Sequence, residues 1–264
     1  MKHKYLLLFF CLFFVQTLHA QRIALVGAMD QEIAILLEAM GKPKKTTHGG
    51  IDFYKGKLMG KKVVVVKSGV GKVNAAYSTA VLIENFSPSK LIFTGVAGGL
   101  HPEALPGDLV IGEALVQYDF GKIDSVGFEV APFPKLLGGR HEELNIASDP
   151  VLVGLSQKIA QEMDFLAVAG RQPKVFSGVI ATGDVFVSSN EKAAWLNSEF
   201  QALATEMEGA AIAHICRSLH VPFIVIRSCS DNANNHARLS FNQFVGPASA
   251  NSAKLVMGML KAME

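Results

Sequence analysis

The chain has 264 residues, half of which are hydrophobic, and its formal net charge at pH 7 is +2. That length and composition can bury one large core, while the near-neutral charge and the lack of Lys/Arg runs argue against a nucleic-acid partner. The eight histidines and three cysteines show no metal-ligand spacing, so we expect neither a metal site nor a cofactor.

The first 20 residues differ from the rest of the chain. Lys2, His3 and Lys4 precede an apolar run at 5–15, and a short stretch then leads to Ala20. We predict a signal peptide at 1–20, a mature domain at 21–264 and an exported protein, periplasmic or secreted. The apolar run is short for a membrane span, so no membrane association is expected after cleavage. An uncleaved anchor is the alternative, and a cytoplasmic protein follows if the segment is misread.

The mature part alternates apolar strands with helical stretches. We predict strands at 22–27, 53–58, 62–67, 91–94, 108–117, 175–180 and 222–231, and helices at 30–40, 71–86, 151–163, 191–200, 210–219 and 247–263. Residues 118–145 carry glycine, proline and charge without a period, which predicts a long loop. The alternation predicts one α/β domain with a mixed, mostly parallel sheet.

The loop after the first predicted strand carries acids. It reads Gly27-Ala-Met-Asp-Gln-Glu32. Backbone N–H groups at a helix start usually favour an anion, but Asp30 and Glu32 already supply negative charge there. A phosphate-binding loop is therefore disfavoured, whereas a general base that activates water is compatible. The alternative assigns Asp30 as the helix cap and Glu32 as a partner of the helix dipole.

A second group of acids follows two later strands. Glu206, Met207 and Glu208 stand between a strand and a helix, and Asp231 ends the next strand, which also contains Arg227. Ligands bind where consecutive strands of a parallel sheet end, so these carboxylates and Arg227 should converge on one cleft. Buried charges are rarely unpaired, so Arg227 should meet a carboxylate or a ligand. A hydroxyl-rich substrate with a basic nitrogen suits this cleft.

Two further loops follow predicted strands. Residues 94–99 read Thr-Gly-Val-Ala-Gly-Gly, and their glycines allow close backbone approach to a ligand, although a tight turn alone explains them better. Residues 182–187 read Thr-Gly-Asp-Val-Phe-Val. There Phe186 either stacks on a heterocycle beside backbone donors or belongs to the core.

Together these segments resemble the nucleoside phosphorylase/nucleosidase superfamily, and within it the 5′-methylthioadenosine/S-adenosylhomocysteine nucleosidases. The resemblance runs from Ile23 to the last predicted helix. Its six motifs are Val26-Gly-Ala-Met-Asp-Gln-Glu32, Lys67-Ser-Gly-Val-Gly-Lys-Val73, Thr94-Gly-Val-Ala-Gly-Gly-Leu100, Thr182-Gly-Asp-Val-Phe186, Glu206-Met-Glu208 with Ala211-Ile-Ala-His214, and Arg227 to Asp231 with Leu239-Ser-Phe241. The resemblance implies a three-layer α/β/α sandwich and a homodimer in which a partner loop completes each site.

The resemblance also implies roles. Asp231, oriented by Ser230, would be the general acid at adenine N7, and Glu32 the general base for the attacking water. Glu208 would hold the ribose hydroxyls, with Met207 against the sugar. The remaining substrate-binding residues would be Val70 and Phe241 at the alkylthio group, Phe186 and Val187 at adenine, Arg227 beside Glu208, and Val96, Ala97, Gly98 and Glu206.

The expected reaction is hydrolysis of the N-glycosidic bond of a small-molecule nucleoside, releasing adenine and a thioribose, as in methionine salvage. One carboxyl group must protonate the leaving base while another activates water, as in inverting glycosidases. Three alternatives stay open: a purine nucleoside phosphorylase, a nucleosidase for another nucleoside such as futalosine, and a non-catalytic exported storage or binding protein. The acids at the first loop argue against phosphorolysis, and the presence of Glu32, Glu208 and Asp231 argues against a non-catalytic role.

Overall fold

The computed structural model describes residues 22–135 and 138–263. The predicted signal peptide and its cleavage site lie outside the described residues. The strands are β1 (Ile23–Gly27), β2 (Lys44–His48), β3 (Ile51–Leu58), β4 (Lys61–Lys67), β5 (Lys90–Gly99), β6 (Leu109–Gln117), β7 (Gly121–Ile123), β8 (Phe128–Val130), β9 (Ile146–Ala147), β10 (Val175–Thr182), β11 (Ala202–Glu206) and β12 (Phe223–Asp231). The helices are α1 (Asp30–Met40), α2 (Lys72–Phe86), α3 (Pro150–Glu162), α4 (Asn190–Phe200), α5 (Gly209–Ser218) and α6 (Ala237–Ala262).

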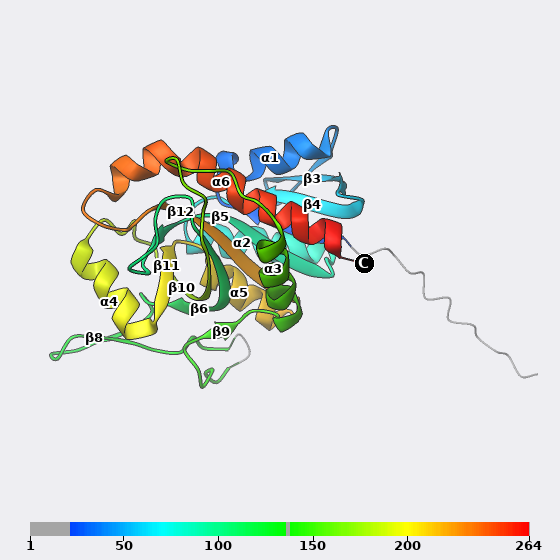
Figure 1. The fold of residues 1–264 in the computed structure, drawn as a ribbon. Helices are drawn as coiled ribbons and strands as arrows, with labels where there is room; N and C mark the ends of the chain where they lie inside the picture. Colours follow the sequence, from blue (N-terminus) through cyan, green and yellow to red (C-terminus); the bar gives the residue numbers. More distant parts are fainter. Residues whose placement is uncertain (1–21, 136–137, 264) are drawn as a thin grey trace, which may run out of the picture.

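One mixed sheet runs through the molecule in the order β11-β10-β6-β12-β5-β1-β4-β3-β2 (Figure 1). Parallel pairs join β1 to β4 and β5, β5 to β12, and β10 to β6 and β11. Antiparallel pairs include β12 with β6 and the β2–β3–β4 meander. Because β11 also pairs with β5, this half of the sheet closes on itself. The expected α/β class with a mixed sheet is confirmed.

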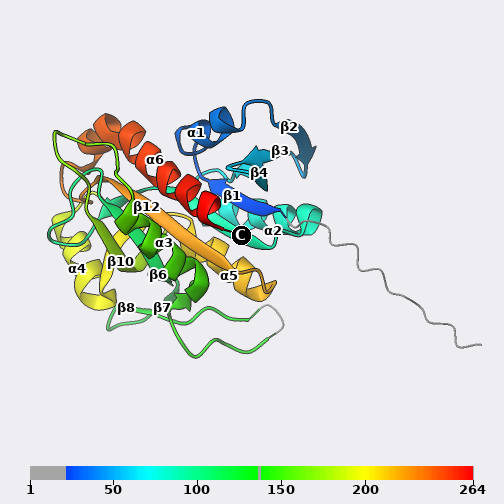
Figure 2. The same ribbon diagram turned by 45° about the vertical axis from the view of Figure 1, so that its right-hand side comes forward.

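Helices cover both faces of the sheet, and the valine run of β4 shows why. Side chains alternate across a strand, so Val64 and Val66 pack into a core with α2 and α5, whereas Val63 and Val65 pack into a core with α1, α3 and α6. Figure 2 shows α3 and α6 crossing the same face of the sheet. The three-layer α/β/α arrangement implied by the resemblance is therefore present.

Four features differ from the sequence-based expectation. The segment 95–99 is the end of β5 rather than a turn, because it pairs with β12 and β11. The strand β2 has no apolar alternation to reveal it, and a β7–β8 hairpin interrupts the predicted loop at 118–145. Helix α6 begins ten residues earlier than expected and continues through Pro247, although proline lacks the N–H that a helix uses.

The start of α1 also differs. The cap position is Met29, and Asp30 is the first helical residue, so the expected Asp30 cap is wrong. The Asp30 side chain instead forms an exposed ion pair with Lys67 at 2.9 Å. Within the described residues, no helix is long and apolar enough to cross a bilayer.

Candidate functional site

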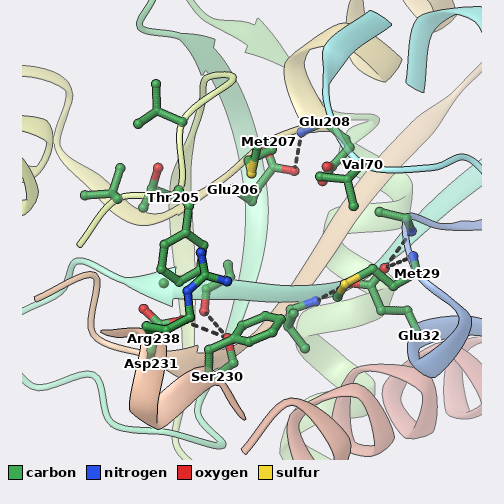
Figure 3. Close-up of a pocket in the computed structure, with 18 residues that line it drawn as sticks. Met29, Glu32, Val70, Thr205, Glu206, Met207, Glu208, Ser230, Asp231 and Arg238 are labelled. Carbon is green, nitrogen blue, oxygen red and sulfur yellow. Dashed lines mark hydrogen bonds between the residues drawn. The ribbon is translucent and has the colours of Figure 1, made fainter. Parts of the chain in front are cut away.

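A cavity of about 410 Å³ lies where β1, β5, β11 and β12 end (Figure 3). It is lined by Ala28, Met29, Glu32, Val70, Val96, Ala97, Gly98, Val185, Phe186, Val187, Thr205, Glu206, Met207, Glu208, Ser230, Asp231, Arg238 and Phe241. Every sequence-predicted site residue lines it except Arg227. The convergence follows from topology, because β5 and β12 run parallel and end at the same edge.

Glu32 is buried in this cavity and is oriented by backbone amides. Its carboxylate accepts hydrogen bonds from the N–H groups of Ala28 at 2.5 Å, Met29 at 2.9 Å and Val96 at 2.9 Å. Burial raises the pKa of Glu32 above its ordinary value, while Arg227 and these three amides act in the opposite direction. A fixed carboxylate that binds protons more readily than usual is suited to accept one from water.

Arg227 lies behind the cavity wall and is fully buried. Its guanidinium bonds Glu206, lies 3.3 Å from a Glu208 oxygen and 3.7 Å from a Glu32 oxygen, and stacks 3.9 Å from the Phe93 ring centroid. One guanidinium thus lies within ion-pair distance of three carboxylates. The sequence predicted that Arg227 would meet a carboxylate or a ligand, and it meets carboxylates. The resemblance placed Arg227 among the substrate-binding residues, but it lies beneath the residues that line the cavity.

The backbone of β5 leaves room for this arrangement. A Cβ atom at Gly95 would collide with the Arg227 guanidinium and the Glu32 carboxylate, and one at Gly98 would lie 3.0 Å from an Asp231 oxygen. The glycines therefore allow close approach within a strand, whereas the sequence favoured a tight turn. The close approach is to the site's own side chains.

Glu206 anchors helix α5. Its oxygens accept from the N–H groups of Glu208 at 3.0 Å and Gly209 at 2.8 Å, from the Thr182 hydroxyl, and from Arg227. A carboxylate at a helix start satisfies amides that lack partners within the helix. Because protein donors already engage both oxygens, Glu206 is better placed to hold Glu208 and Arg227 than to bind a ligand.

Glu208 faces the cavity from the start of α5 (Figure 3). One oxygen accepts the Gly71 N–H at 2.8 Å, at the start of α2. Burial, followed by the nearby Glu206 carboxylate, raises the pKa of Glu208 to about 8, although Arg227 and the Gly71 amide oppose the shift. Glu208 therefore binds a proton more readily than an ordinary glutamate does.

Asp231 lies across the cavity from Glu32 (Figure 3). It accepts the Ala233 N–H at 2.8 Å and the Ser230 hydroxyl at 2.9 Å. Burial raises the pKa of Asp231 to about 6, and these two hydrogen bonds oppose the shift. Near neutral pH, Asp231 can hold and release a proton, which is the property of a general acid.

The rest of the wall is mainly apolar. Phe186 and Phe241 meet edge to face with ring centroids 5.8 Å apart, and the Arg238 guanidinium lies 4.5 Å from the Phe186 centroid. The sequence did not predict Arg238, which belongs to the first turn of α6, ahead of the helix predicted at 247–263. Arg238 could have been identified from its position three residues before Phe241, because residues three apart share one face of a helix.

A charged network joins three loops beside the cavity. Lys72 Nζ lies 2.5 Å from Asp119 and 3.8 Å from Asp184, and the Lys72 N–H donates to Asp184 at 2.8 Å. The Asp184 N–H in turn donates to Asp119 at 2.8 Å. The start of α2, the end of β6 and the loop after β10 are thereby held together. In the part of the chain that the structure describes, no cluster of side chains is suited to a metal ion.

Comparison with known proteins gives consistent results. Residues 22–261 match the family model described as the phosphorylase superfamily. A 5′-methylthioadenosine/S-adenosylhomocysteine nucleosidase of Shewanella pealeana is 36% identical over 92% of this chain and 100% of its own. The Neisseria meningitidis nucleosidase of that name, solved with methylthio-immucillin-A, is 38% identical with a TM-score of 0.81, covering 92% of this chain and 100% of its own. A Helicobacter pylori structure described as futalosine hydrolase is 35% identical with a TM-score of 0.80, covering 92% and 99%.

Proposed function

The chain belongs to the phosphorylase superfamily, and from this premise we propose that it hydrolyses the N-glycosidic bond of 5′-methylthioadenosine and S-adenosylhomocysteine, releasing adenine and the thioribose product. It is an N-glycosyl hydrolase of the nucleosidase type found among its relatives. The observation that carries the proposal is the pair of buried carboxyl groups, Glu32 and Asp231, that face one cavity from opposite sides.

Asp231 is the proposed general acid. Cleavage of the bond leaves negative charge on adenine, and protonation at N7 makes the base a better leaving group. A carboxyl group with a pKa of about 6 can donate this proton near neutral pH. The Ser230 hydroxyl donates to Asp231 and fixes its orientation.

Glu32 is the proposed general base. The sugar gains positive, oxocarbenium-like charge as the bond breaks, and water must attack the face opposite the base. The three amides that fix Glu32 hold its carboxylate in place for that water. Arg227 and the three amides oppose the effect of burial, although the pKa of Glu32 remains above its ordinary value.

Glu208 is proposed to hold the ribose hydroxyls, with Met207 beside the sugar. Phe186 would stack on adenine and the Val187 backbone would bond its edge, while Val70 and Phe241 would enclose the 5′ alkylthio group. All six residues line the cavity, which supports these assignments. Glu206 and Arg227 position Glu208 from behind.

The charges of the cavity favour water over phosphate. Glu32, Glu206 and Glu208 gather on one side around a single arginine. Two like charges about 4 Å apart repel by roughly 4 kcal/mol at an effective dielectric near 20. A phosphate next to an ionised Glu32 would meet that repulsion, whereas water would meet a hydrogen-bond acceptor.

The test is to incubate the purified protein with 5′-methylthioadenosine, S-adenosylhomocysteine, futalosine and adenosine, with and without phosphate, and to quantify free base and sugar. We expect adenine and free sugar from the first two nucleosides, at rates indifferent to phosphate. Stoichiometric sugar 1-phosphate that forms only with phosphate would favour phosphorolysis. Preferential cleavage of futalosine would favour the second candidate, which the Helicobacter pylori structure supports.

Glu32→Gln separates binding from chemistry. The substitution keeps the size of the side chain but removes the proton acceptor, so hydrolysis should fall by at least about 10²-fold while the nucleoside still binds. Single-turnover assays and calorimetry with 5′-methylthioadenosine measure the two effects. Near-normal turnover would remove Glu32 from the mechanism.

The protein is also proposed to act as an exported homodimer. Export follows from the N-terminal 20 residues. Dimer formation is supported by apolar side chains that stand in solvent on the β7–β8 hairpin and on α2, where Val126 is 96% and Val73 is 80% exposed. Exposed apolar groups mark an interaction surface where they form one contiguous patch.

A further inference from the structure

One face of the β2–β3–β4 meander carries a group of lysines for which the proposed reaction has no role. Side chains alternate along a strand and directly paired residues share a face, so Lys44, Lys55, Lys57 and Lys62 lie on the same face of the sheet. This group is termed the basic face. Lys44, Lys57 and Lys62 are exposed, and Lys55 is half-buried. The three strands form one edge of the sheet (Figure 2).

The register sets these lysines against each other. Lys44 pairs with Lys55, and Lys57 pairs with Lys62, both directly across antiparallel strands. Like charges in such positions are destabilising. Within the described residues, none of the four forms an ion pair. Asp52, the only acid of the three strands, lies on the opposite face. The fold therefore holds two repelling pairs side by side without a paired acid.

Two ordinary explanations do not account for this group. Lysines on an edge strand prevent pairing with other chains, but only Lys44 lies on the edge strand β2, and both β3 and β4 are interior. A strongly basic composition would also place lysines together, but the chain has 25 basic and 23 acidic residues. The concentration of charge is therefore a property of this surface, and it favours an anionic partner.

An apolar side chain occupies the tip of the same hairpin. Met59 and Gly60 join β3 to β4 in a two-residue turn, and both have positive φ, 48° and 80°. Such a turn favours Asn-Gly, yet the chain has a methionine there that is 41% exposed. A methionine beside several lysines suits a partner that is anionic at its boundary and apolar inside.

The hairpin tip lies at the opposite end of the strands from the cavity. Strand β4 runs parallel to β1. The tip directly precedes β4, whereas the cavity wall begins at Ala28, just after the end of β1. A partner bound at the tip therefore leaves the cavity open to its substrate.

We propose that the basic face and Met59 bind this protein peripherally to an anionic phospholipid membrane. The lysines would meet lipid phosphates, which relieves their mutual repulsion, and Met59 would enter the boundary between headgroups and acyl chains. The inference does not depend on the proposed function. It differs from the expectation of no membrane association after cleavage, because that expectation followed from the apolar run at 5–15 and not from the fold.

The test is sedimentation of the protein comprising residues 21–264 with phosphatidylcholine vesicles that contain or lack phosphatidylglycerol. This part includes the whole segment matched by the family model. We expect binding only to the phosphatidylglycerol vesicles, and its loss at high salt. Lys57→Gln with Lys62→Gln should weaken binding about 25-fold, since each lysine near an anionic surface contributes about fivefold.

The matched control is Lys158→Gln with Lys261→Gln. It removes two exposed lysines from α3 and α6, which pack on the other face of the sheet, and it should leave vesicle binding nearly unchanged. An equal loss in the two double variants would overturn the inference, because the protein would then respond only to its total charge.

Lys62→Glu distinguishes a binding role from a structural one. The substitution replaces a repelling pair with an attractive one, so the thermal midpoint should rise by about 1–3 °C. Vesicle binding should nevertheless fall further than in Lys62→Gln. A lower midpoint, or unchanged binding, would contradict the proposed surface.

Met59→Asn distinguishes a membrane from a soluble polyanion. Asn-Gly suits this turn, so the fold should be kept, while loss of the apolar contact should lower vesicle affinity about three- to tenfold. Retention on heparin should not change. If the wild type bound heparin alone, or if Met59→Asn bound the vesicles as the wild type does, the partner would not be a membrane. Each of these outcomes leaves the proposed nucleosidase activity standing.

Discussion

At the scale of single residues, burial gives the two catalytic candidates their character. Asp231 and Glu32 are both carboxylic acids, both buried, and both have a raised pKa. They differ in their partners: Arg227 lies 3.7 Å from Glu32 and favours its charge, whereas Asp231 is held by one amide and one hydroxyl. Groups with the same chemistry can therefore take opposite roles as base and acid.

Asp231→Asn should abolish release of adenine and still allow nucleoside binding. An amide cannot donate the proton that the leaving base needs, and loss of general acid catalysis costs about 10²- to 10⁴-fold in rate. Release of adenine in a coupled assay and nucleoside affinity by calorimetry measure the two parts. Turnover close to that of the wild type would assign the proton to another group.

The same variant should show a pH-dependent gain in stability. The pKa of Asp231 rises from 3.8 to about 6 on folding, so the folded protein binds more protons than the unfolded chain between these values. Stability is therefore lost as the pH rises through that window, by up to about 3 kcal/mol at about 1.36 kcal/mol per pKa unit. An asparagine side chain does not ionise, so the variant does not lose stability as the pH rises through this window.

Urea unfolding at pH 4 and pH 7 checks the sign. Asp231→Asn should be nearly as stable as the wild type at pH 4 and more stable at pH 7. If the difference in the free energy of unfolding between Asp231→Asn and the wild type stayed constant with pH, burial would not raise the pKa of Asp231.

At the scale of elements, the start of α2 links the cavity to its surrounding loops. Its first amides bind two carboxylates, since the Gly71 N–H donates to Glu208 and the Lys72 N–H donates to Asp184. The Lys72 side chain adds the half-buried pair with Asp119. These contacts fix the position of Val70, which lines the cavity two residues before Lys72.

Lys72→Met should weaken substrate binding more than it slows the chemical step. The side-chain volume is nearly kept, but the Asp119 and Asp184 carboxylates lose their common cation and repel each other. We expect KM to rise about five- to tenfold, kcat to fall less, and stability to drop by about 1–2 kcal/mol. Steady-state kinetics and thermal unfolding measure these effects.

The matched control is Lys67→Met. Lys67 also pairs with an aspartate, Asp30, but both partners are exposed, and exposed pairs contribute less than about 1 kcal/mol. Equal effects of the two substitutions on KM would show that the Lys72 network does not position the site.

At the level of the whole molecule, several apolar side chains are exposed on the β7–β8 hairpin and on α2. The β7–β8 hairpin projects from the body (Figure 1), and its residues Ile123, Val126 and Phe128 are exposed. Val73 and Tyr77 are exposed on α2. The contact between Lys72 and Asp119 shows that α2 starts near the segment leading into the hairpin.

Ile123→Ser with Val126→Ser should therefore convert a dimer into monomers and reduce activity, since the resemblance implies that a partner loop completes each site. Light scattering after gel filtration gives the mass in solution. Val151→Ser removes an equally exposed apolar side chain from α3 and should leave the mass unchanged. A wild-type protein that is monomeric at micromolar concentration would contradict the proposed dimer.

Export is tested on the intact cell. Protein isolated from its native host should begin at Gln21, as shown by mass spectrometry of its N-terminal peptide. Leu7→Arg interrupts the apolar run and should retain the full-length chain in the cytoplasm. Recovery of wild-type protein that begins at Met1 in the cytoplasm would reject the signal peptide.

The order of the main elements and the edge at which they end can be predicted from the sequence. The strands β1, β4, β5, β6 and β12 each contain a buried run of apolar residues, which is a local property of the sequence. Because parallel strands end at a common edge, the sequence also predicted that Glu206, Glu208 and Asp231 would share one cleft. The structure places all three there, and their roles remain predictions.

The surroundings of each charged group depend on tertiary packing. Arg227 meets Glu32 across 195 positions of the chain and lies beneath the cavity instead of lining it. Arg238 enters the cavity because α6 begins before Pro247. The raised pKa of Asp231 and that of Glu208 come from desolvation by distant segments. Burial and charge pairing depend on which segments pack together, and the pattern within one segment does not specify its neighbours in the fold.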